Sequence, residues 1–321
     1  VPNAVRWPDC ATPRAGKSII PSMDKRQALI FSFWIGALFS WISACTPLST
    51  PTPTPTQIPI KYATPTLSVP ILAEPSPTPE SCIGTRGQVE KIAFDSPALP
   101  HFYIYLPECY ALDDETDYPV LYLLHGQGYE ADQWLRLGMA ERAAALMAAE
   151  EISPFLIVMP YDKASWRGVD DDQFGEVFVN KLIPYIDENY RTIAKRESRA
   201  VGGLSRGAGW AIRYGLKRWG LFGALGAHSP AIFYRDYKKL DDWIAEIPDK
   251  YLPQIYIDIG DLDGERGDAT NFSELLAEEN VIHEWHLYSG AHEESYWQAH
   301  IDDYLHWYGC FLGCSLEIET P

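Results

Sequence analysis

The sequence predicts an α/β domain whose central β-sheet is mostly parallel, with helices on both faces and an antiparallel hairpin at the N-terminal end. Short apolar runs such as residues 119–124 (PVLYLL) have the composition of strands buried on both faces. They alternate with amphipathic stretches of helical length such as residues 174–190, and this alternation indicates parallel pairing. Residues 81–321 are also long enough for one such unit.

The predicted elements follow one another in order along this domain. Residues 87–94 and 101–106 alternate apolar and polar side chains around a Ser-Pro turn, which is typical of a hairpin. Further strands are predicted at residues 119–124, 155–159, 199–204, 221–227, 254–259 and 283–288. Helices are predicted at residues 131–150, 174–190, 206–218, 239–244, 272–279 and 293–311.

The N-terminal part has the pattern of a bacterial lipoprotein signal peptide at residues 23–45. A basic start at Met23 leads into an apolar run, and small residues precede Cys45. Cys45 is therefore the predicted lipidation site, and we expect an extracytoplasmic protein anchored to a bacterial cell membrane. An uncleaved transmembrane anchor is the alternative, with the same location. Residues 1–22 precede the predicted start and are interpreted as a non-native upstream extension.

Residues 46–80 form a linker rich in Pro and Thr. Alternating Pro and Thr cannot build a core and favours extended polyproline II. We therefore expect a semi-rigid spacer that holds the domain of residues 81–321 away from the membrane.

The charge and the cysteines of the chain indicate which ligands and which disulfides to expect. The chain has 26 basic and 44 acidic residues, a net charge of −18, and such a surface repels nucleic acid. Of the three possible pairings of the four domain cysteines, Cys82–Cys109 with Cys310–Cys314 is the one we expect. The cysteine spacing does not resemble a zinc site, and we expect no metal or cofactor.

Residues 203–207 read Gly-Leu-Ser-Arg-Gly, a G-x-S-x-G motif between a predicted strand and a predicted helix. A strand that turns sharply into a helix with Ser at the apex is the nucleophile elbow of the α/β-hydrolases. Glycines are needed there because a Cβ two residues from the Ser would collide with the neighbouring element. Ser205 is therefore the predicted nucleophile. An ordinary serine in a glycine-rich turn is the alternative.

A serine nucleophile needs backbone N–H donors for the oxyanion that forms when it attacks an ester. Arg206 follows the nucleophile and supplies one predicted donor. Gln127, in the His-Gly-Gln-Gly loop after the strand of residues 119–124, supplies the other. His125 precedes the elbow, and we interpret it as a scaffold residue.

The acid and the base are expected on loops after later strands. Asp261 and Asp263 follow the strand of residues 254–259, at the edge where catalytic groups gather in a parallel sheet. Asp263 is the favoured acid, and Asp261 remains the alternative. His292, on the loop Ser-Gly-Ala-His after the last strand, is the predicted general base. His228 comes before the acid, but it could line the pocket.

Aromatic side chains near predicted loop ends suit a substrate that contains a sugar or a phenolic ring. We assign a substrate-binding role to Trp134 and Trp166, and packing in the core is the alternative for both. The run Asp170-Asp171-Asp172 is interpreted as a solvated loop and not as a metal site.

Six stretches together resemble the putative esterase family of the α/β-hydrolases, which includes feruloyl and acetylxylan esterases and S-formylglutathione hydrolase. They are LLHGQGYEADQW (123–134), FLIVMPYD (155–162), KLIPYIDENYR (181–191), RAVGGLSRGAGWA (199–211), YIDIGDLDG (256–264) and SGAHEESYW (289–297). The resemblance implies the α/β-hydrolase fold, with Ser205 as nucleophile, Asp263 as acid and His292 as base. Arg206 and Ala208 stand where the family usually has Met and Gly.

The expected function is therefore that of an extracytoplasmic serine carboxylic-ester hydrolase. It would act through an acyl-enzyme on feruloyl or acetyl esters of carbohydrates. One alternative is an acyltransferase that uses the same triad, in which a sugar hydroxyl replaces water. The other is a non-catalytic carbohydrate-binding module.

Overall fold

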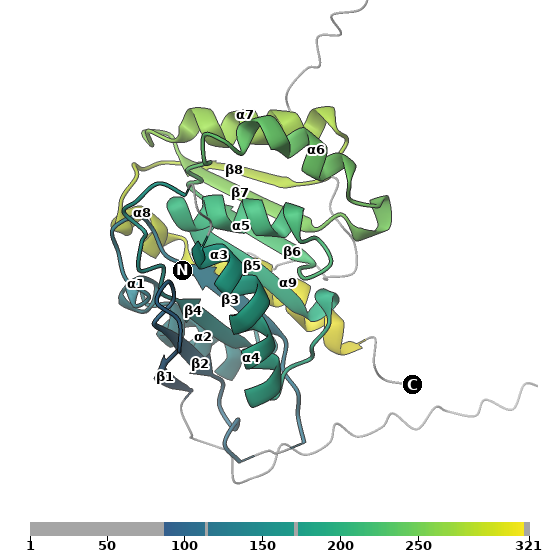
Figure 1. Ribbon diagram of the computed structural model, residues 1–321. Helices are drawn as coiled ribbons and strands as arrows, with labels where there is room; N and C mark the ends of the chain where they lie inside the picture. Colours follow the sequence, from purple (N-terminus) through teal and green to yellow (C-terminus); the bar gives the residue numbers. More distant parts are fainter. Residues whose placement is uncertain (1–86, 113–114, 170–172, 318–321) are drawn as a thin grey trace, which may run out of the picture. The chain divides into compact units, whose positions relative to one another are not determined.

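The structure is a computed structural model that describes residues 87–112, 115–169 and 173–317 (Figure 1). The predicted upstream extension, the predicted signal peptide with Cys45 and the Pro/Thr-rich linker lie outside the described residues. Cys82 and the side chain of Cys314 are also outside them, so the disulfide pairing stays a prediction. No helix in the described part is both long and apolar enough to cross a membrane.

One eight-stranded sheet forms the centre of the domain, with the strand order β1-β2-β4-β3-β5-β6-β7-β8 (Figure 1). The strands are β1 (Gln88–Ala93), β2 (His101–Leu106), β3 (Val120–Leu124), β4 (Leu156–Pro160), β5 (Arg199–Leu204), β6 (Ala224–His228), β7 (Gln254–Gly260) and β8 (Glu284–Tyr288). β2 pairs antiparallel with β1 and β4, and every other pairing is parallel. The predicted mostly parallel sheet with an N-terminal hairpin is confirmed.

Helices cover both faces of this sheet, because successive side chains of each strand point to opposite faces. On β3, Leu121 and Leu123 pack with α2 (Met139–Ala148) and α9 (Ile301–Glu317). The alternate residue Tyr122 packs on the other face with α5 (Arg206–Lys217). The same face also holds α6 (Leu240–Ala245) and α7 (Arg266–Glu278) over β6 and β7 (Figure 1).

Three predicted helices are interrupted in the structure. The helix predicted at 131–150 is split into α1 (Gln133–Arg136) and α2, because Gly138 between them has a φ of 91°. The helix predicted at 293–311 is split into α8 (Glu294–Ala299) and α9. The segment 174–190 contains a π-helical turn, Phe178–Leu182, between α3 (Gln173–Val177) and α4 (Ile183–Asn189).

The parallel strands determine where loop residues meet. β3, β4, β5, β6, β7 and β8 all run in the same direction, so the loops that follow them lie at one edge of the sheet. The predicted catalytic and oxyanion residues and Trp166 all follow these strands.

Candidate active site

Ser205 sits on a strained turn between β5 and α5, with φ 54° and ψ −120°. The turn is tight because a Cβ on Gly203 would lie 2.4 Å from the backbone carbon of Gly207, and a Cβ on Gly207 would lie 2.1 Å from the Leu124 carbonyl oxygen. Only glycine fits at either position. The Ser205 N–H donates to the His228 carbonyl oxygen at 2.9 Å, which ties the apex to β6.

The structure brings Ser205, His292 and Asp263 into one hydrogen-bonded chain. His292 lies on the loop between β8 and α8, and its Nε2 is 2.8 Å from Ser205 Oγ. Its Nδ1 is 2.9 Å from both carboxylate oxygens of Asp263, on the loop after β7. In the neutral imidazole, Nδ1–H donates to the carboxylate and Nε2 accepts from the serine hydroxyl. This is the arrangement by which an imidazole removes the proton of an attacking hydroxyl.

The surroundings of Asp263 favour its ionised form. Burial alone would raise the pKa of this carboxyl, but hydrogen bonds from His292, from the Glu265 N–H and from Ser229 outweigh it. The pKa of Asp263 is therefore below its usual value of 3.8. A carboxylate that stays charged can stabilise an imidazolium at His292.

Asp261, the alternative acid, contacts backbone groups and not the imidazole of His292. Its Oδ1 accepts the N–H of Gly290 at 2.9 Å, and its own N–H donates to the Tyr288 carbonyl oxygen at 2.8 Å. Asp261 therefore joins the loop after β7 to the loop that leads to His292. It is exposed, whereas Asp263 is buried.

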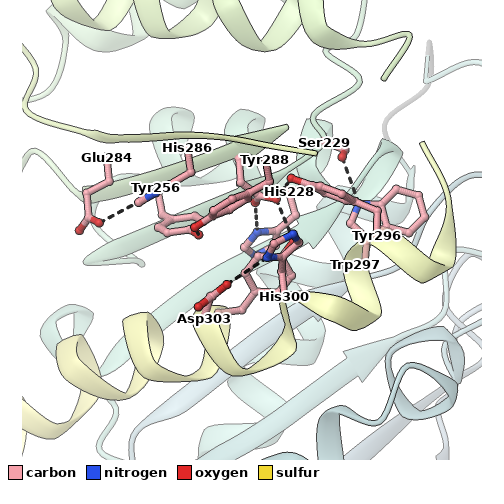
Figure 2. A network of polar contacts seen from close by, with 12 residues as sticks. His228, Ser229, Tyr256, Glu284, His286, Tyr288, Tyr296, Trp297, His300 and Asp303 are labelled. Atoms are coloured by element: carbon pink, nitrogen blue, oxygen red, sulfur yellow. Dashed lines mark hydrogen bonds and ion pairs between the residues drawn. The ribbon is translucent and has the colours of Figure 1, made fainter. Parts of the chain in front are cut away.

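Trp297 and Ser229 support this series of hydrogen bonds. Trp297 Nε1 donates to Ser229 Oγ at 3.1 Å, and Figure 2 shows the indole reaching Ser229 beside His228. The same indole packs edge-on against the His292 ring, with the ring centroids 5.1 Å apart. Ser229 thus contacts Asp263 and Trp297 at once, and these contacts hold Asp263 and His292 in place. A serine with positive φ (48°) directly after a strand is not recognisable in the sequence.

Beneath the site lies a buried polar network around Asp258 in β7. Its Oδ1 is 2.7 Å from His228 Nδ1, and its Oδ2 accepts the hydroxyls of Tyr296 and Tyr304 at 2.8 Å each. His228 Nε2 is 3.0 Å from the Tyr308 hydroxyl. Burial, together with the nearby Asp258 carboxyl, raises the pKa of Tyr296 and Tyr304, so both remain donors. His228 is fully buried and does not line a pocket, contrary to the possibility raised from the sequence.

A row of stacked rings borders this network (Figure 2). Tyr256 stacks on His286, His286 on Tyr288, and Tyr288 on His300, with centroid distances of 4.5, 5.6 and 4.1 Å. His300 also bonds Asp303 through Nδ1 at 3.0 Å. These contacts fix the break between α8 and α9, and they give His286 and His300 packing roles.

The loop after β3 presents Gln127 at the same edge of the sheet. The N–H groups on either side of Gln127 have partners within the protein: Gly126 donates to Gln133 Oε1 at 2.8 Å, and Gly128 donates to Ser165 Oγ at 3.2 Å. The backbone N–H groups of Gln127 and Arg206 donate to no group in the described part of the chain. Arg206 is the first residue of α5, where an N–H has no intrahelical acceptor. Both N–H groups thus remain available for an external acceptor.

Gln133 is a supporting residue that sequence reasoning missed. It is fully buried, and besides holding Gly126 it donates through Nε2 to Glu294 Oε1 at 3.2 Å. Glu294 begins α8, two residues after His292. Gln133 therefore links the loop that carries Gln127 to the loop that carries His292. In the sequence, Gln133 is one of several polar residues of the helix predicted at 131–150, and nothing marks it as buried.

His125 is a scaffold residue in the structure. Its Nδ1 lies 2.9 Å from the Gly126 carbonyl oxygen, and its Nε2 accepts the Asp162 N–H at 2.9 Å. Burial lowers the pKa of His125, which agrees with a neutral ring that accepts at Nε2. The Asp162 carboxylate in turn holds the side chains of Arg206 and Trp210, each at 3.2 Å.

The two tryptophans predicted to bind substrate have different places. Trp134 is fully buried, its Nε1 donates to the Leu124 carbonyl oxygen at 3.1 Å, and its ring packs against His228 and Tyr304. The substrate-binding role predicted for Trp134 is therefore wrong, because a core residue has no surface to offer a ligand. Trp166 is 64% exposed and lines a cleft of about 570 Å³ together with Gln127 and Arg206.

Within residues 87–112, 115–169 and 173–317, no three His, Cys, Asp or Glu side chains are grouped so as to hold a metal ion.

The fold and the site together define the class of protein. A mostly parallel sheet with a serine on a strand–helix turn, and an aspartate and a histidine on loops after two later strands, is the architecture of the α/β-hydrolases. Residues 98–308 match the family described as "Putative esterase". The chain therefore belongs to the putative esterase family and carries its ester-hydrolase domain.

Curated relatives and solved structures agree with this assignment. An esterase of Mycobacterium tuberculosis is 34% identical over 154 residues, which are 45% of this chain and 32% of the relative. A protein of Xylanibacter ruminicola named endo-1,4-beta-xylanase/feruloyl esterase is 29% identical over 223 residues, 62% of this chain and 30% of the relative. This chain thus spans about a third of the length of these relatives.

Two solved structures share the fold. A ferulic acid esterase is 24% identical, with a TM-score of 0.63, and the match covers 70% of this chain and 98% of that one. An S-formylglutathione hydrolase from Staphylococcus aureus is 21% identical, with a TM-score of 0.58 and the same coverage of both chains.

Proposed function

We propose that the protein is a serine carboxylic-ester hydrolase that acts through Ser205, His292 and Asp263. The observation that carries the proposal is the continuous path of hydrogen bonds from Ser205 Oγ to Asp263. Ser205 Oγ attacks the carbonyl carbon of the ester while His292 Nε2 takes the hydroxyl proton. Asp263 keeps the imidazole oriented and stabilises the imidazolium that forms.

The remaining steps return the enzyme to its starting state. The carbonyl oxygen becomes an oxyanion, which accepts hydrogen bonds from the backbone N–H groups of Gln127 and Arg206. When the tetrahedral intermediate collapses, the bond to the alcohol breaks and His292 gives its proton to the leaving oxygen. Water then attacks the acyl-enzyme by the same route, releasing the acid and regenerating Ser205.

We propose a feruloyl or acetyl ester of a carbohydrate as the substrate. Two facts support it: the similarity to proteins named feruloyl esterase, and the exposed ring of Trp166 in the cleft beside Gln127. A panel of feruloyl-sugar, acetyl-sugar and simple alkyl esters tests this choice. A kcat/KM that is no higher for the sugar esters than for the alkyl esters would contradict it.

The signal-peptide pattern that ends at Cys45 supports a location outside the cytoplasm. We propose that the protein is a lipoprotein and lies outside the cytoplasm. Mass spectrometry of the wild type should find Cys45 at the N-terminus with the added mass of a lipid, and Cys45→Ala should lack that mass. A wild-type Cys45 without the lipid mass would contradict the lipid anchor.

Replacement of the nucleophile tests the catalytic proposal. Ser205→Ala should lower kcat for p-nitrophenyl acetate by about 10⁴-fold or more, as removal of a triad nucleophile does elsewhere. Ser153→Ala is the matched control, because Ser153 precedes β4 at the opposite edge of the sheet. An active Ser205→Ala enzyme would contradict the proposal.

A further inference from the structure

The cleft beside Gln127 and Arg206 is rich in cations, although the chain as a whole is acidic. The net charge of the chain is −18. Of the residues that line the cleft, one is an aspartate and six are basic: Arg167, Arg206, Arg213, Lys217, Arg235 and Lys239. A cluster of positive side chains on a protein of negative net charge creates a local positive potential, which attracts anions.

Part of this charge is neutralised within the protein. The buried side chain of Arg206 pairs with Asp162 at 3.2 Å. The buried side chain of Arg213 pairs with Asp236 at 2.6 Å. These pairs are structural, since each guanidinium is needed to compensate a buried carboxylate.

Lys217 also pairs with Glu176, at 3.9 Å. Arg167 and Lys239 are exposed, and neither forms an ion pair with another residue in the described part of the chain. The guanidinium carbon of Arg167 lies 4.9 Å from the centroid of the Trp166 ring. The Arg167 backbone is also fixed, because its carbonyl oxygen accepts from the Arg206 side chain at 2.9 Å. The loop therefore holds a positive charge beside the residue after the nucleophile.

Exposed aromatic rings lie among these cations. Trp166 is 64% exposed and Tyr234 is 84% exposed, and both line the cleft. Large rings left in solvent at the mouth of a cleft provide faces on which a sugar or phenolic ring stacks. Asp170, Asp171 and Asp172 follow Val169 and lie outside the described residues.

We propose that the cleft selects an anionic ester: a substrate whose ring stacks on Trp166 or Tyr234 and carries a carboxylate or another anionic group held by Arg167 and Lys239. The proposal rests on the proposed ester hydrolysis and adds the charge class of its substrate. Beyond the Debye length of about 10 Å at 0.1 M salt, charges on the acidic surface are largely screened. The local cations therefore determine whether an anion is accepted.

Matched pairs of esters test the proposal with the full chain. The first pair is the mono(4-nitrophenyl) ester of terephthalic acid and its methyl-capped form, which differ by a carboxylate on the acyl side. The second pair is 4-acetoxybenzoate and its methyl ester, which differ by a carboxylate on the alcohol side. The readout is the ratio of kcat/KM for the anionic ester to that for the neutral ester.

We expect the wild-type ratio to exceed that of Arg167→Gln or Lys239→Gln by about 3-fold, and that of the double variant by about 10-fold, in at least one pair. The control Lys181→Gln, an exposed lysine away from the cleft, should keep the wild-type ratio. Salt should lower the wild-type ratio and leave that of the double variant nearly constant.

Equal ratios in the wild type and the double variant for both pairs would overturn the inference while the proposed function stands. If the wild type hydrolyses none of the four esters faster than Ser205→Ala, the proposed function fails, and the inference fails with it.

Discussion

Asp261 and Asp263 lie on the same loop but have different surroundings. Asp263 is buried and contacts the imidazole of His292, whereas Asp261 is exposed and contacts a backbone N–H. Asp263→Asn should lower kcat/KM by about 10³- to 10⁴-fold, because an amide does not stabilise the imidazolium. Asp261→Asn should cost less than about 10-fold, because the amide oxygen can still accept the Gly290 N–H. A larger loss of kcat/KM in Asp261→Asn than in Asp263→Asn would make Asp261, and not Asp263, the partner of His292 in catalysis.

The lowered pKa of Asp263 also predicts how stability depends on pH. The folded-state pKa is below the usual carboxyl value of 3.8, so the folded protein binds this proton less tightly than the unfolded chain does. The stabilisation is present above the unfolded pKa and is lost as pH falls through the folded pKa. When the free energy of unfolding is measured with urea at a series of pH values, it should fall more steeply for the wild type than for Asp263→Asn from about pH 5 downward. Parallel curves for the wild type and Asp263→Asn would contradict this.

At the scale of residues, the sequence predicts those side chains whose chemistry is tied to a local motif. Ser205 lies in a glycine motif, and Asp263 and His292 follow strands at which a parallel sheet gathers its catalytic groups. Trp134 was misassigned because whether a ring faces the core depends on the packing of α1, which no local pattern records. Ser229 and Gln133 were missed because their partners lie far away in the chain.

At the scale of elements, two glycines share a position but differ in their surroundings. Gly207 and Gly267 are each the second residue of a helix, α5 and α7. A Cβ on Gly207 would lie 2.1 Å from the Leu124 carbonyl oxygen, whereas nothing lies within 4 Å of one on Gly267. Gly207→Ala should therefore destabilise the protein by about 1–3 kcal/mol, and Gly267→Ala should stabilise it by up to about 1 kcal/mol. Chemical denaturation measures both, and equal effects would contradict the close approach at the turn.

The network around Asp258 joins β7 to β6, α8 and α9. Asp258→Ala would leave His228, Tyr296 and Tyr304 without their shared acceptor in the core, so we expect a loss of about 3–5 kcal/mol in unfolding free energy. Asp242→Ala, at an exposed position of α6, is the control and should change stability by less than about 0.5 kcal/mol. A loss below about 1 kcal/mol at Asp258 would show that the network is not a main support of the fold.

The elements themselves were predictable to the extent that their signals are local. Every strand of the sheet overlaps the range predicted for it, whether the signal was an apolar run or an alternation of apolar and polar side chains. The breaks at Gly138 and His300 and the π-helical turn were not predictable, because the apolar periodicity continues through them. α7 begins at Arg266, earlier than predicted, because its first turns are polar and carry no periodic signal.

At the scale of the whole molecule, the sheet topology assembles the site. Ser205 and His292 are 87 residues apart in the chain. Because β5 and β8 end at the same edge of one sheet, Ser205 Oγ and His292 Nε2 lie 2.8 Å apart. The fold class followed from the alternation of strands and helices. The concentration of cations at the cleft did not, because Arg167, Arg213 and Lys239 come from separate loops and helices.

Covalent labelling of the active serine tests the central claim most directly. The full chain is treated with a fluorophosphonate, and the modified residue is identified by peptide mass spectrometry. We expect a single label, on Ser205, that is lost in His292→Ala because the hydroxyl then has no base. Esterase activity with the label on another serine, or with no label on Ser205, would contradict it.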